Sequence, residues 1–74
     1  SGKNAEIKKD YLVGFKTNVT NESKNIVNSL GGSVHHQYKY MDVLHVSLPE
    51  KAAEALKNNP NVAFVDLDAE VQAF

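Results

Sequence analysis

The sequence predicts a small α+β domain in which one β-sheet is covered by two helices. Three observations lead to this prediction. Four short segments alternate apolar and polar residues, which is the period of a strand with one buried face. Two other segments carry apolar or small residues at helical spacing. Turn residues separate these segments in the order strand, helix, strand, strand, helix, strand within 74 residues.

The first strand and the first helix are expected in the N-terminal half. Residues 10–16 alternate, and the positions on one face are Tyr11, Val13 and Phe15. Gly14 lies inside this strand, which indicates that another backbone or a bulky side chain approaches closely there. A helix is expected to begin at Thr20 or Asn21, since either side chain can accept a hydrogen bond from an unpaired backbone N–H. The glycine pair at 31–32 ends it, because glycine adopts the left-handed cap without steric cost.

A pair of strands is expected next. Residues 33–40 predict the second strand, with apolar positions at Val34, Tyr38 and Tyr40. Met41 and Asp42 form the expected turn, and residues 43–48 predict the third strand, with apolar positions at Leu44, Val46 and Leu48. A two-residue turn would place the two apolar sets on opposite faces, because side chains alternate strictly along a strand. Either the turn has an odd number of residues or a bulge, or both faces of the sheet are buried.

The second helix and the last strand complete the order. Pro49 is expected at the first helical position, where its missing N–H is no loss, and residues 58–60 end this helix. In the last strand, one face is expected to carry Phe64, Asp66 and Asp68. The face toward the helices is expected to carry Ala63, Val65 and Leu67. Two successive units in the order strand, helix, strand predict the ferredoxin-like βαββαβ arrangement, a four-stranded antiparallel sheet with two helices on one face.

Length and charge exclude several classes of protein. One domain is expected over residues 1–74, with a flexible N-terminus at 1–9, a core at 10–69 and an extended C-terminal tail at 70–74. The absence of cysteine excludes disulfides and thiolate metal sites. A formal net charge of −1, with no arginine, gives no electrostatic basis for binding nucleic acid or an anionic membrane. The apolar runs are too short for a membrane span or a retained signal peptide, and no cofactor is expected.

Three histidines are candidates for a metal site or a pH sensor: His35, His36 and His45. In a regular strand His35 and His36 point to opposite faces, so they cannot chelate one ion together. Carboxylate or thiolate companions at suitable spacing are missing, so no metal site is expected. Surface histidines are the favoured interpretation, and a pH-dependent interface is the alternative.

The C-terminal residues are the strongest candidates for a binding site. Val71 and Phe74 can fill two separate apolar pockets while the backbone between them pairs as an added strand. The competing interpretation is a disordered tail. Asp66 and Asp68, on the same face as Phe64, suit the N-termini of partner helices, where unpaired N–H groups attract anions. The competing interpretation there is a solvated edge.

Four stretches in the right order and spacing carry a family resemblance from about residue 8 to the last residue. They are Tyr11-Leu12-Val13-Gly14-Phe15-Lys16, Gly31-Gly32-Ser33-Val34, Gln37-Tyr38-Lys39-Tyr40-Met41-Asp42 and Asn59-Pro60-Asn61-Val62-Ala63-Phe64-Val65. The chain resembles the propeptide of bacterial subtilisin-type serine proteases. That resemblance implies a ferredoxin-like fold and a secreted protein without catalytic activity. It also implies an intramolecular chaperone and inhibitor that forms a 1:1 complex with a subtilisin-like serine protease.

The resemblance also implies roles for particular residues. Phe74 corresponds to the residue before the processing site, and the cleft-binding tail comprises Val71, Gln72, Ala73 and Phe74. Asp66 and Asp68 stand where the family has acidic residues that cap protease helices, and Phe64 belongs to the same interface. Leu67, Glu70 and the His35-His36 pair depart from the family pattern.

Other functions of this fold remain as alternatives. A free-standing inhibitor or binding module without its own protease is the main one. An RNA-binding module would need a basic surface that this composition lacks. Catalysis is not expected, because the chain has no cysteine, no serine with an evident histidine partner, and no arginine to hold a phosphate group.

Overall fold

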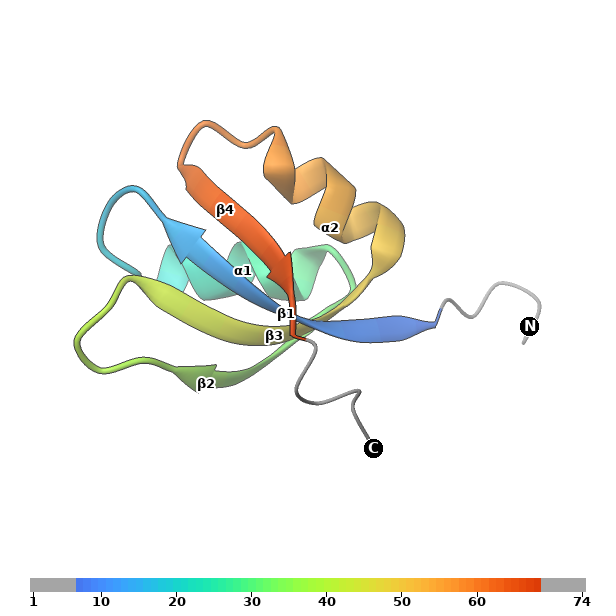
Figure 1. Ribbon diagram of the computed structural model, residues 1–74, viewed down its shortest axis with the longest axis horizontal. Helices are drawn as coiled ribbons and strands as arrows, with labels where there is room; N and C mark the ends of the chain where they lie inside the picture. Colours follow the sequence, from blue (N-terminus) through green and yellow to red (C-terminus); the bar gives the residue numbers. More distant parts are fainter. Residues whose placement is uncertain (1–6, 69–74) are drawn as a thin grey trace.

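The computed structural model describes residues 7–68. Its elements are β1 (Lys8–Phe15), α1 (Asn21–Ser29), β2 (Ser33–Gln37), β3 (Val43–Pro49), α2 (Glu50–Lys57) and β4 (Val62–Leu67). The strands form one sheet in the order β2-β3-β1-β4, and each neighbouring pair is antiparallel (Figure 1). The predicted ferredoxin-like arrangement is therefore confirmed.

One hydrophobic core joins both helices to one face of the sheet. The strands contribute Tyr11, Val13, Phe15, Leu44, Val46, Leu48, Val62 and Val65, and the helices contribute Val27, Ala52, Ala53 and Leu56. The alternation along β1 and β3 explains this arrangement, because every second side chain of each strand points toward the helices. The residues between them lie on the opposite face, which no helix within residues 7–68 covers.

The start of α1 is fixed by its own sequence. Thr20 is the N-cap, and its hydroxyl accepts hydrogen bonds from the backbone N–H groups of Glu22 and Ser23. The Ser23 hydroxyl accepts in return from the Thr20 N–H, which completes a capping box. At the other end Gly31 has a φ of +84°, a conformation that favours glycine. Both predicted boundaries of this helix are confirmed.

The connection between β2 and β3 is longer than predicted. Strand β2 ends at Gln37 rather than residue 40, and residues 38–42 form the loop. The Phe15 N–H donates to the Asp42 carbonyl at 2.8 Å, which ties this loop to the end of β1. Tyr40 was expected in the second strand but lies at the loop tip with 88% of its surface exposed. The bulge between Val34 and His36 solves the problem of side-chain parity, because the pairing changes there from His36 with His45 to Val34 with Val46.

Two predictions around α2 and β4 were wrong. Pro49 is the last residue of β3 and the N-cap of α2, with an extended backbone, so the helix itself begins at Glu50. In β4 the pairing register shifts between Gly14 and Phe15. This irregularity leaves Ala63 exposed and places Val62 in the core instead. Of the three residues expected to face the helices, only Val65 is buried, and Leu67 is 48% exposed.

Candidate docking face

The sheet face opposite the helices carries most of the candidate site residues. We call it the open face, and it is formed by Asp10, Leu12, Gly14, Val43, His45, Phe64, Asp66 and Asp68. The register places Leu12 between His45 on β3 and Asp66 on β4. Gly14 pairs with Phe64 in the same way. The face therefore combines an apolar end near Gly14 with a polar end near Asp10.

Phe64 lies directly against Gly14. A Cβ atom built on Gly14 would be only 2.1 Å from Phe64 Cε2, so the ring occupies the space of the missing side chain. The close approach predicted at Gly14 is thus confirmed. Phe64 still exposes 40% of its surface, which leaves part of the ring available for contact with another molecule.

The two candidate capping carboxylates differ in their surroundings. Asp66 is exposed on edge strand β4. Asp68 follows the strand, and its backbone N–H donates to the Asp10 carbonyl at 2.9 Å, which extends the pairing with β1. The Asp68 side chain is only 17% exposed, and its Oδ2 atom lies 3.5 Å from His45 Nε2. Asp66 presents its charge to solvent, whereas Asp68 shares contacts with the neighbouring strands.

Histidines and carboxylates form a cluster that the sequence analysis missed. His35 Nε2 lies 3.6 Å from Asp10 Oδ1, and His45 Nε2 lies 4.0 Å from the same atom. The rings of His35 and His45 have centroids 5.2 Å apart. The bulge in β2 brings His35 to the side of the sheet on which His45 lies, so the regular alternation assumed for His35 and His36 does not hold. His36 is paired with His45 in the register, and its ring makes an edge contact with Tyr38.

The sequence comparisons identify the family of this chain. A family model described as the fervidolysin N-terminal prodomain matches residues 4–68. The chain belongs to this prodomain family. It is also 39% identical over 72 residues to subtilisin E of Bacillus subtilis strain 168, and equally to subtilisin J of Geobacillus stearothermophilus. Each match covers 92% of the prodomain but only 19% of the relative, so the chain spans about a fifth of the subtilisins that it matches. The subtilisin-type propeptide resemblance is confirmed.

Part of the predicted site lies outside the described residues. The candidate cleft-binding residues are Val71, Gln72, Ala73 and Phe74, and all four follow residue 68. Within residues 7–68, no group of three His, Asp or Glu side chains is arranged to hold a metal ion. The described helices of the prodomain are also too short and polar to cross a membrane.

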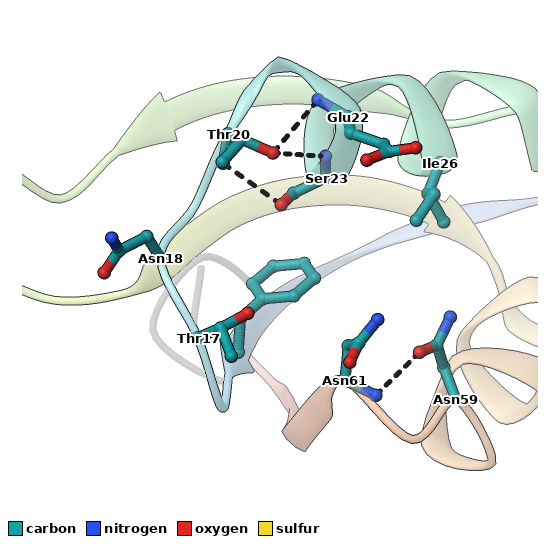
Figure 2. A pocket seen from close by; sticks show the side chains of 9 residues that line it. Thr17, Asn18, Thr20, Glu22, Ser23, Ile26, Asn59 and Asn61 are labelled. Carbon is teal, nitrogen blue, oxygen red and sulfur yellow. Dashed lines mark hydrogen bonds between the residues drawn. The ribbon is translucent and has the colours of Figure 1, made fainter.

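The prodomain has a hollow of about 330 Å³, lined by both polar and apolar residues, at the N-terminus of α1. It is lined by Phe15, Thr17, Asn18, Thr20, Glu22, Ser23, Ile26, Asn59 and Asn61 (Figure 2). Several of its polar groups are already paired, because Thr20 and Ser23 cap the helix and the Asn61 N–H donates to Asn59 Oδ1 at 2.8 Å. These polar groups already serve the helix cap and the turn at Asn59–Asn61. The open face therefore remains the candidate site.

Proposed function

We propose that this prodomain is an intramolecular chaperone and inhibitor of a subtilisin-like serine protease, and that it is not itself an enzyme. The observation that carries the proposal is the open face, which combines a partly exposed Phe64 with the carboxylates of Asp66 and Asp68. Because helices cover just one side of the described sheet, a second layer of protein structure can pack on the other side. The family membership favours a protease domain as that layer, in a 1:1 complex outside the cell.

The open face suits the N-terminal ends of two protease helices. Each such end presents unpaired N–H groups and the positive end of the helix dipole, both of which attract carboxylates. Asp66 and Asp68 lie two positions apart on the edge of the sheet, so they can reach neighbouring helix ends. Phe64 adds an apolar contact beside them. In this proposal the same surface guides folding of the protease, because a preformed face orders the helices that it contacts.

The C-terminal residues supply inhibition. β4 ends at Leu67, and the chain continues for seven more residues to Phe74. We propose that residues 71–74 lie in the active-site cleft as a product-like peptide, with the Phe74 carboxylate near the catalytic serine. Val71 and Phe74 fill two apolar pockets, and the backbone pairs as an added strand.

Inhibition of a purified subtilisin by the full chain and by residues 1–70 tests this proposal. The shortened chain should inhibit much more weakly, since each anchor residue of such an interface contributes roughly 2–4 kcal/mol. Circular dichroism of the two free chains should match, because the deleted residues follow the last strand. Equal inhibition by both chains would exclude the product-like mechanism, and no inhibition by the full chain would exclude the inhibitor function itself.

A further inference from the structure

The cluster on the open face joins all four strands. His35 comes from β2, His45 from β3 and Asp10 from β1, and Asp68 directly follows β4. Each histidine lies within 4.0 Å of at least one carboxylate oxygen. Such contacts become ion pairs only when the imidazole is protonated, and histidine is the side chain that ordinarily changes charge between pH 5 and 8.

His45 carries the clearest sign of a prepared proton site. Its Nε2 atom is buried and has no hydrogen-bond partner within residues 7–68. Buried polar atoms are normally paired, so an unpaired one needs an explanation. This atom faces Asp68 Oδ2 at 3.5 Å and Asp10 Oδ1 at 4.0 Å. A protonated imidazole donates from both ring nitrogens, so protonation would supply a charged donor between two acceptors.

We propose that the cluster of His35, Asp10, His45 and Asp68 makes docking of the open face sensitive to pH, so that acidification releases the prodomain from its protease. The inference rests on the proposed function, because it requires that the open face bind the protease. It adds regulation by pH to that function. Neither the fold nor the family match indicates such regulation.

The direction of the effect follows from charge. With neutral histidines, the carboxylates of Asp10, Asp66 and Asp68 make the polar end of the open face negative, which suits the positive ends of partner helices. Protonation of His35 and His45 adds two positive charges to this region and draws the Asp68 carboxylate toward His45. The face then loses attraction for the helix ends, and docking buries charges that were partly exposed.

The other charged or titratable groups near the cluster in the described residues are Lys8, Lys9 and His36, besides the Asp66 carboxylate already named. Lys8 is the next residue on the same side of β1, two positions before Asp10 and opposite Pro49, and its charge is the same throughout the pH range of the test. Lys9 points to the other face and pairs with Glu50 at 3.4 Å. Helices α1 and α2 pack on the core side, so their charges do not enter the cluster. His36 pairs with His45 in the register, but its ring contacts Tyr38, whereas the carboxylate contacts in the described residues are made by His35 and His45, so His36 provides a matched control.

The test is the dissociation constant of the full chain for a subtilisin inactivated at its catalytic serine, measured from pH 8 to pH 5. Inactivation prevents cleavage of the prodomain during the measurement. The original chain should bind on the order of tenfold more weakly at pH 5 than at pH 8, the scale of a charge placed at a helix end. The chain with both His35→Gln and His45→Gln should lose this dependence, whereas His36→Gln should retain it.

The possible outcomes separate the two proposals. Tight binding at pH 8 with the same pH dependence in the double variant would overturn the pH switch and leave the proposed function intact. Absence of binding at pH 8 would overturn both. Titration of the protease itself contributes equally to every variant, so the difference between the double variant and His36→Gln isolates the cluster. Circular dichroism at both pH values checks that each variant is folded, and single variants replace the double variant if it is not.

Discussion

The aromatic ring of Phe64 fills the position that a side chain on Gly14 would occupy. This contact crosses from edge strand β4 to central strand β1, and it fixes where the ring lies on the open face. Gly14 therefore has a steric role: it provides the space in which Phe64 rests.

Replacing Gly14 with alanine should displace Phe64. The new Cβ would lie 2.1 Å from the ring, so the ring must move, and its partial exposure allows it to do so. We expect a loss of about 1–3 kcal/mol in the free energy of unfolding, the range of overpacking, together with weaker binding to subtilisin. In a chain that already carries Phe64→Ala, adding Gly14→Ala should cost much less stability than it does in the original chain, because the clash with the ring is then absent. Denaturant unfolding of the two single variants and the double variant measures this coupling.

Asp66→Asn should weaken docking without weakening the fold. Asp66 is exposed and retains its shape as asparagine, so only its charge is lost. We expect a binding loss of about 0.3–2 kcal/mol if the carboxylate meets a helix end, measured by calorimetry with inactivated subtilisin. Glu54→Gln on α2 is the control, since this carboxylate pairs with Lys57 away from the open face. An equal effect from both changes would indicate general charge attraction rather than a specific contact.

Thr20→Ala should destabilise the prodomain by removing the cap of α1. Its hydroxyl accepts from two backbone N–H groups, those of Glu22 and Ser23, and alanine leaves both without this acceptor. We expect a loss of about 1 kcal/mol in the free energy of unfolding. Thr17→Ala changes an exposed threonine in the preceding loop and should stay within about 0.5 kcal/mol of the original chain. Equal stability of the two variants would contradict the assigned role of Thr20.

Local sequence signals predicted the features that depend on neighbouring residues. Alternation gave the four strands, the Thr20 cap gave the start of α1, and Gly14 indicated a close neighbour. The strand irregularities were not predictable in this way, because a bulge depends on pairing between distant segments. The irregularity in β4 moved Ala63 out of the core, and the bulge in β2 brought His35 beside His45. The histidine cluster, which requires four strands to meet, was therefore out of reach of a strand-by-strand analysis.

The last prediction concerns the stability of the free prodomain. A chain of 74 residues without cysteine has a small core and no covalent cross-link, and its open face is half of an interface in the proposed complex. We expect a low melting temperature for the free chain and a rise with increasing concentration of inactivated subtilisin, because a ligand that binds only the folded form stabilises it by mass action. The 1–70 chain should show a smaller rise, since it retains the face but lacks the cleft-binding tail.

The same face should accelerate folding of the protease. Adding the prodomain in trans to denatured subtilisin should increase the rate at which activity appears after the prodomain is degraded. Asp66→Asn should reduce this acceleration in proportion to its loss of binding, whereas Thr17→Ala should not. A free chain that melts cooperatively at high temperature and leaves the refolding rate unchanged would contradict the chaperone function. Such a domain would fold without the protease and would not help the protease to fold.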